Sequence, residues 1–299
     1  MSLRAELLRL SMKAWKLSRS KRRHVSMAKV RSRLRLIEPI VPRPPSGTKS
    51  TAIDVDGIKA IEILVPEART DRHILHFHGG GYAFGTEPLV RDFTWRLGAA
   101  TGATVLYFDY RLAPEHPFPA AVEDAAKVFR WLAARMNTDR IAFIGDSAGG
   151  GLLLATLHKM RDEGFNLPSA AVALSPWTDL ALTGQSLHSN ARSDPLMDVT
   201  RLPAYAQRYL AGADPRHPYA SPLYGDASGL SPLLIQVGSD EILRDDAVRI
   251  AEKVREAGGE VELEEWPRMP HGWQHYARII PEGRRAIERI GVFVQTRLN

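Results

Sequence analysis

Short apolar segments alternate with segments of helical periodicity along most of the chain, and this alternation constrains the fold more than any other feature. The strand-like segments are residues 58–65, 73–77, 103–108, 140–144, 170–174, 232–237 and 260–265. Helical patterns occupy residues 120–135, 152–160, 246–257 and 281–297. Strands that are connected through helices form a mostly parallel sheet with helices on both faces. The sequence therefore predicts an α/β fold.

Composition limits the kinds of chemistry that the chain can use. The 299 residues are 44% hydrophobic and 25% charged, which suits one large globular domain. The chain has no cysteine, which excludes disulfides, thiol catalysis and zinc bound by cysteine. We expect no metal and no cofactor. The apolar runs are shorter than the ~20 residues of a membrane span, and no secretory leader pattern is present, so we expect a cytoplasmic protein.

The basic character of the chain is concentrated at its N-terminus. Residues 1–35 carry twelve basic residues and one acidic residue, a net charge of +11, whereas the remaining residues sum to −5. This arm contains an apolar stripe at helical spacing, formed by Leu3, Leu7, Leu10, Ala14 and Leu17. We expect an amphipathic helix whose stripe docks on its own domain. Binding of a membrane surface or of nucleic acid, and a transit peptide, are the alternatives.

Two segments interrupt the alternation of strands and helices. Residues 41–47, VPRPPSG, break the helical pattern and link the arm to the main domain. Residues 178–212 have little strand character, and we expect them to form an insertion of helices over the edge of the sheet.

The segment IGDSAGGG at residues 144–151 lies between a predicted strand and a predicted helix. Its pattern Gly145-x-Ser147-x-Gly149 is typical of a nucleophile elbow, a sharp turn that exposes a serine hydroxyl at the carboxyl end of a strand. Glycine-rich turns at this place also bind phosphates, so the motif needs support from other residues.

An activated serine needs donors for the oxyanion and a carboxylate that orients the base. Three glycines at residues 79–81 follow the strand at 73–77, and they suit an oxyanion hole that the N–H of Ala148 completes. Asp240 follows the strand at 232–237, so we predict it as the acid. We expect the adjacent Glu241 to point away. Asp245 and Asp246 begin the next helix and resemble N-terminal helix carboxylates.

The order serine, acid, histidine places the base after Asp240 and leaves two candidates, His271 and His275. His271 lies in the loop that follows the strand at 260–265, beside Gly272, and we predict it as the base. We expect His275 to be a surface or core histidine on the following helix.

Aromatic residues next to these motifs indicate a small substrate pocket. Tyr82 and Phe84 follow the glycines, and Trp177 follows the strand at 170–174. We predict that the three side chains crowd the reacting carbonyl and favour acyl chains of roughly two to eight carbons, because overfilling a packed site is unfavourable.

The motifs together resemble the bacterial hormone-sensitive-lipase family of α/β-hydrolases, the family IV esterases. The resemblance rests on HGGG at 78–81, DYRLAPEHPFPAA at 109–121, GDSAGG at 145–150, and the segments around 240 and 271. It implies an α/β-hydrolase fold and a triad of Ser147, Asp240 and His271. It also implies oxyanion donors at Gly80, Gly81 and Ala148. A helical cap would consist of residues 1–45 and the insertion at about 178–212, over a catalytic domain at 46–299.

The expected activity is hydrolysis of short-chain acyl esters through an acyl-enzyme. Two alternatives use the same fold: an amidase or deacetylase of the arylacetamide type, and a non-catalytic ligand-binding protein, for which loss of the catalytic histidine would be typical. The expected partner is a small-molecule ester. We expect no nucleic acid and no stable membrane insertion, and a homodimer is possible.

Overall fold

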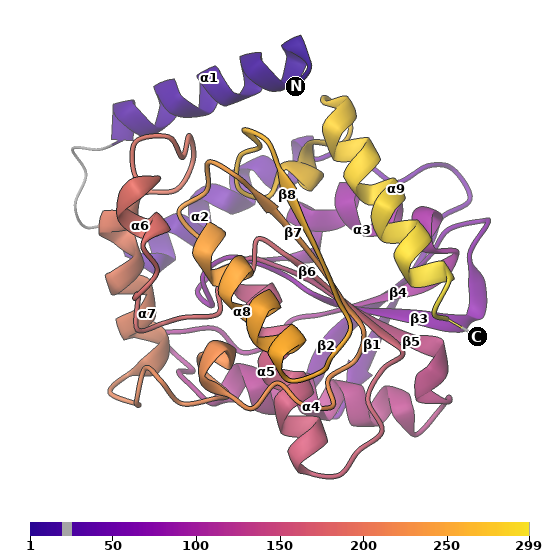
Figure 1. Ribbon diagram of the computed structural model, residues 1–299. Coiled ribbons are helices and arrows are strands. Elements are labelled where there is room, and N and C mark those ends of the chain that lie inside the picture. The colour runs from indigo at the N-terminus through magenta and orange to yellow at the C-terminus, as the bar shows by residue number, and fades with distance from the viewer. Residues whose placement is uncertain (20–25, 299) are drawn as a thin grey trace.

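The computed structural model describes residues 1–19 and 26–298, and its core is one sheet between two layers of helices (Figure 1). The strands are β1 (Lys49–Val55), β2 (Ile58–Leu64), β3 (Arg69–Phe77), β4 (Ala103–Phe108), β5 (Ile141–Asp146), β6 (Ala170–Leu174), β7 (Leu233–Gly238) and β8 (Val261–Trp266). Within the described residues the α-helices are α1 (Leu3–Arg19), α2 (Met27–Ile37), α3 (Glu87–Thr101), α4 (Ala120–Ala133), α5 (Ala148–Asp162), α6 (Ser186–Ser189), α7 (Leu202–Leu210), α8 (Arg244–Glu256) and α9 (Pro281–Gln295).

The sheet has the order β1-β2-β4-β3-β5-β6-β7-β8. β1 and β2 pair antiparallel, β2 also pairs antiparallel with β4, and the neighbours from β4 to β8 are parallel. The predicted mostly parallel sheet is therefore confirmed. β1 was not predicted. Its side chains are mostly exposed because it lies at the edge of the sheet.

Alternate side chains along the strands build two separate hydrophobic cores. On β3, for example, Leu75 belongs to the core that includes residues of α4, α5 and α8, and Ile74 belongs to the core that includes residues of α3 and α9. The period of two is what a strand buried on both faces requires. The prediction of helices on both faces of the sheet is thus confirmed, although α3 was not anticipated.

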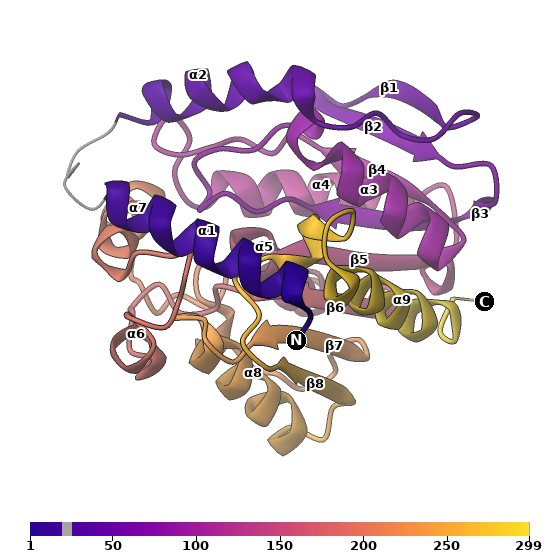
Figure 2. The ribbon, with the colours of Figure 1, turned by 90° about the horizontal axis from the view of Figure 1, so that it is seen from above.

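α1 lies outside these layers, at the top of Figure 1 and nearest the viewer in Figure 2. Its inner face buries Ala5 and Met12. Ala5 belongs to a small core with Met269, Trp273 and Ile280, in and after the loop that follows β8. Residues 1–19 therefore rest on the segment that carries the predicted base.

The predicted orientation of the apolar stripe is wrong. Its five members are all exposed: Leu3, Leu7, Leu10, Ala14 and Leu17. The helix docks instead through its opposite face, which buries Ala5, Arg9 and Met12. Three of the basic residues of the arm, at positions 21–23, lie outside the described residues. No helix among residues 1–19 and 26–298 is long and apolar enough to cross a membrane.

Candidate active site

Ser147 occupies a strained turn between β5 and α5. Its backbone angles, φ 55° and ψ −122°, lie in a region of conformational space that residues other than glycine rarely adopt. The neighbouring glycines make this turn possible. A Cβ on Gly149 would lie 2.0 Å from the carbonyl oxygen of Phe77, and a Cβ on Gly145 would lie 2.5 Å from the carbonyl oxygen of Gly149. The small residues of the motif therefore allow α5 to approach β3 and β5, which sets the position of the serine.

His271 is paired with a buried carboxylate. Its Nδ1 lies 2.7 Å from Oε2 of Glu241, whose side chain is fully buried. The other oxygen, Oε1, accepts hydrogen bonds from the hydroxyl of Ser175 at 2.7 Å and from the N–H of Gly238 at 2.6 Å. These bonds fix the carboxylate, and the carboxylate in turn fixes the orientation and tautomer of the imidazole ring.

The prediction that Asp240 is the acid is wrong, because this side chain contacts α1 instead. Oδ2 of Asp240 lies 2.8 Å from a guanidinium nitrogen of Arg9. After β7 the chain turns, and the N–H of Glu241 donates to the carbonyl oxygen of Gly238. This turn directs Glu241 inward and Asp240 outward, the reverse of what we expected for the two adjacent residues.

The surroundings of His271 favour its protonated form. Burial by itself would lower the pKa of the ring, but the negative charge and the hydrogen bond of Glu241 act in the opposite direction. The charges of Asp194 and Asp146 add to the effect of Glu241. The balance raises the pKa of His271 above its ordinary value, so the ring can take up a proton within the site.

The predicted oxyanion donors lie in two loops that meet at the serine. Gly80 and Gly81 line the same cavity as Ser147. In the described part of the chain, their N–H groups donate to no carbonyl or side chain. Ala148 is the first residue of α5, so its N–H has no partner within the helix. The loop is tightened by Gly80, whose carbonyl oxygen accepts from the N–H groups of Ala83 and Phe84.

His78 contacts the glycine loop and packs against the neighbouring Tyr110. Its ring stacks on Tyr110 with centroids 4.1 Å apart, and its Nδ1 lies 2.7 Å from the carbonyl oxygen of Gly79. Burial lowers the pKa of His78 to about 4, so the ring is neutral near pH 7. We interpret His78 as part of the scaffold of the loop.

A cavity of about 370 Å³ opens at the carboxyl ends of the strands, where parallel sheets place their ligands. Ser147 and His271 both line it. Further lining residues come from α1, the glycine loop, the insertion and the segment after β8: Trp15, Lys16, Phe84, Trp177, Leu196, Met197, Leu202, Tyr205, His275 and Tyr276.

The three predicted aromatic residues divide into two groups. Phe84 and Trp177 line the cavity. Tyr82 does not, and its assignment to the pocket is wrong. Its ring is buried and stacks on Tyr209 of α7 with centroids 3.8 Å apart. Next to glycines the chain reverses direction sharply, so adjacent side chains there face different parts of the molecule.

His275 was expected on the surface or in the core, but it lines the cavity on a short 3₁₀ turn, Trp273–Tyr276. Its Nε2 lies 3.4 Å from Oδ2 of Asp146, the residue before the serine. Nε2 of His76 lies 3.6 Å from the other oxygen of the same carboxylate. Burial would raise the pKa of Asp146, but His275 and His76 hold it well below its ordinary value.

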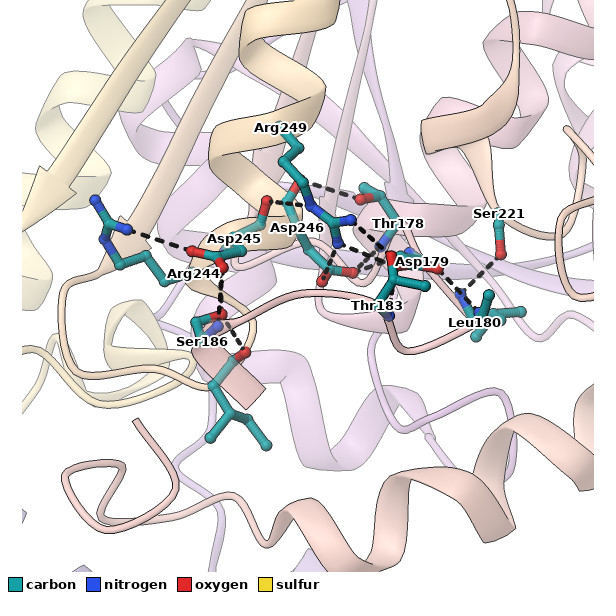
Figure 3. Close-up of polar contacts among 12 residues, drawn as sticks. Thr178, Asp179, Leu180, Thr183, Ser186, Ser221, Arg244, Asp245, Asp246 and Arg249 are labelled. Atoms are coloured by element: carbon teal, nitrogen blue, oxygen red, sulfur yellow. Dashed lines mark hydrogen bonds and ion pairs between the residues drawn. The ribbon is translucent and has the colours of Figure 1, made fainter. Parts of the chain in front are cut away.

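The insertion that forms one wall of the cavity is fixed to α8 by a buried polar network (Figure 3). Oδ2 of Asp246 accepts from the N–H groups of Thr178 and Asp179, at 2.8 and 2.9 Å. Arg249 lies 3.0 Å from the carboxylate of Asp179. Asp245 and Asp246 do lie in the first turn of α8, but they bind the insertion.

Comparison with known proteins relates this chain to hydrolases. The family model of the alpha/beta hydrolase fold matches residues 74–275. An acetyl-hydrolase of Streptomyces hygroscopicus is 49% identical over 236 residues, which make up 79% of each chain. Among solved structures, an esterase from the bacterial hormone-sensitive lipase family is 40% identical with a TM-score of 0.93, covering 100% of this chain and 99% of that one. The esterase EstE5, in a crystal soaked by p-nitrophenyl butyrate, is 36% identical with a TM-score of 0.94 and the same coverage.

Proposed function

Because the chain belongs to the bacterial hormone-sensitive-lipase family of α/β-hydrolases, we propose that it hydrolyses short-chain carboxylic esters through an acyl-enzyme on Ser147. The observation that carries this proposal is the buried pair of His271 and Glu241, because His271 lines the same cavity as the serine. A catalytic histidine with its carboxylate in place does not fit the alternative of a purely ligand-binding protein.

The first half of the reaction transfers the acyl group to the enzyme. Ser147 Oγ attacks the ester carbonyl carbon while Nε2 of His271 takes up the hydroxyl proton, and Glu241 stabilises the imidazolium through Nδ1–H. The negative charge that develops on the carbonyl oxygen is met by the N–H groups of Gly80, Gly81 and Ala148. Collapse of this intermediate breaks the ester C–O bond, and His271 returns the proton to the leaving alcohol.

The second half releases the acid and restores the enzyme. A water molecule gives a proton to His271 and attacks the acyl carbon, and a second tetrahedral intermediate forms in the same oxyanion hole. Its collapse breaks the bond to Ser147 Oγ, which recovers its proton from the histidine. The same three side chains therefore act in both halves.

The size and lining of the cavity favour short acyl groups. Its volume of about 370 Å³ is at the low end for sites that bind small molecules. Phe84, Trp177 and Tyr205 contribute rigid aromatic surface to its walls. We infer a preference for acyl chains of roughly two to eight carbons, since longer chains would overfill the site.

A series of 4-nitrophenyl esters tests the proposal. We expect kcat/KM to be highest within two to eight acyl carbons and to fall for longer chains. The folded variant Ser147→Ala should lose about 10⁴ to 10⁶-fold of the activity, because the nucleophile acts together with its base. Retention of a tenth of the wild-type rate by this variant would refute the assignment of the serine.

A further inference from the structure

The outer face of α1 is an apolar stripe in contact with solvent. Leu3, Leu7 and Leu10 are 77%, 58% and 50% exposed, and Ala14 continues the row. Positions separated by three or four residues lie on one side of a helix, so these four side chains form a continuous strip. Scattered exposed leucines are common on protein surfaces, but an aligned row on one helix is typical of an interaction site.

The contacts of the opposite face prevent the helix from turning this stripe inward. Arg9 pairs with Asp240, and Ala5 and Met12 are buried. Nζ of Lys16 donates to two backbone carbonyls of the insertion, at 3.1 and 2.8 Å. A rotation that buried the leucines would break all of these contacts. The stripe is therefore a stable feature of the folded protein.

The helix that carries the stripe also lines the active-site cavity. The same helix contributes Trp15 and Lys16 to the lining of that cavity. Figures 1 and 2 show α1 as an outer element of the fold, above the other elements in Figure 1 and in front of them in Figure 2. A surface that received the stripe would thus lie next to one wall of the cavity.

Positive charge accompanies the leucines. Arg4 is exposed and Lys13 is half-buried on the two flanks of the stripe. The one acidic residue of the helix, Glu6, lies 3.1 Å from the guanidinium of Arg268 and is neutralised there. An amphipathic helix with basic flanks binds surfaces that combine anionic groups with an apolar interior.

We propose that α1 binds the surface of anionic lipid assemblies, with its leucine stripe in the interface and the active-site cavity close to the lipid. A second copy of this chain fits less well, because a symmetric contact would bring Arg4 and Lys13 close to their own copies. Nucleic acid would bind the basic residues through its phosphates, but it offers no apolar surface on which a row of leucines could pack. This binding does not depend on the proposed catalytic chemistry, so the two are measured separately.

Sedimentation of the full chain with vesicles tests the proposal. The probes are vesicles of equal parts phosphatidylglycerol and phosphatidylcholine, and vesicles of phosphatidylcholine alone. The test variant combines Leu3→Ser, Leu7→Ser and Leu10→Ser. The matched control combines Phe165→Ser, Ile279→Ser and Val292→Ser, which are 42%, 49% and 55% exposed outside α1. Hydrolysis of a soluble ester and the thermal unfolding of each variant verify that the proteins are intact.

We expect the wild type and the control to bind the anionic vesicles, with weaker binding to the neutral ones. The stripe variant should lose at least about tenfold in affinity for the anionic vesicles while its soluble-ester activity remains. Failure of the wild type to bind, or equal binding by the stripe variant, would overturn the proposal. The proposal would also be overturned if the wild type did not bind vesicles but formed a dimer that the stripe variant did not form. The same holds if the wild type did not bind vesicles but retarded duplex DNA in a gel.

Discussion

Two adjacent carboxylates, Asp240 and Glu241, face opposite sides of the turn after β7. Only Glu241 contacts the histidine, at 2.7 Å. We predict that Glu241→Gln lowers kcat by about 10² to 10⁴-fold, because the amide cannot stabilise the imidazolium or enforce the tautomer. Steady-state kinetics with 4-nitrophenyl butyrate measures the loss.

Asp240→Asn is the matched control, since it makes the same chemical change one residue away. It removes a charge from the contact with Arg9 and leaves the histidine untouched. We expect kcat to change by less than about tenfold. If the two variants exchanged their effects, Asp240 would be the acid and the role of Glu241 would be wrong.

The raised pKa of His271 sets the pH dependence of the reaction. Only the neutral ring can accept the serine proton, so kcat/KM should rise with pH as the ring loses its proton. We expect the midpoint to lie above the ordinary histidine value of about 6.5. Because Glu241 favours the charged ring, Glu241→Gln should move the midpoint to lower pH. A wild-type midpoint below 6.5, or an upward shift in the variant, would contradict this description of the site.

Most of the proposed site residues could be identified from the sequence, because each follows a strand or begins a helix. Ser147, His271, Gly80 and Gly81 were singled out in this way, and all four line one cavity. Glu241 contacts His271 in place of the predicted Asp240, and Tyr82 was assigned to the cavity although its ring is buried outside the lining. In tight turns the direction of a side chain depends on local backbone angles, and residue type does not determine those angles. His275 was missed as a lining residue for the same reason.

At the scale of elements, the approach of α5 to β3 is the contact that places the nucleophile. A Cβ on Gly149 would lie 2.0 Å from the backbone oxygen of Phe77, which cannot rotate away as a side chain could. We predict that Gly149→Ala lowers the free energy of unfolding by at least about 3 kcal/mol or prevents folding. Urea denaturation followed by circular dichroism measures the change.

Gly98→Ala in α3 provides the control, as it places the same methyl group on another helical glycine. Its nearest neighbour would be the carbonyl oxygen of Ala103 at 3.3 Å. We expect a change within about 1 kcal/mol, since helix propensity offsets a small steric adjustment. A Gly149→Ala protein as stable as the wild type would show that α5 and β3 are not in close contact.

The elements differed in how far they could be predicted. The strands from β2 to β8 were all found. Among them β4 to β7 carry the strongest apolar patterns, because they are buried along their whole length. β1 was missed since its exposed edge position leaves it with little apolar character. For α1 the period of the leucines was correct, but the spacing of apolar residues shows only that a helix has an apolar face. It does not show whether that face contacts the protein or solvent.

At the scale of the whole molecule, the cavity is assembled from segments that are far apart in the chain. Trp15 of α1, Phe84 of the glycine loop, Met197 of the insertion and His271 meet around one serine. The α/β fold could be predicted from the alternation of strand and helix patterns. The convergence of these residues depends on the order of the strands and on long-range packing, and the local periodicity of the sequence reveals neither. The shape of the pocket therefore came from the structure.

Reaction with diethyl 4-nitrophenyl phosphate, followed by intact and peptide mass spectrometry, tests most directly whether Ser147 is the nucleophile. Attack of its oxygen on phosphorus would release nitrophenolate and leave a stable diethylphosphoryl ester. We predict one adduct per chain at Ser147, loss of esterase activity in proportion to labelling, and no adduct on Ser147→Ala or on wild-type protein unfolded in urea. Equal labelling of Ser147→Ala, or full activity in a labelled wild type, would contradict the mechanism.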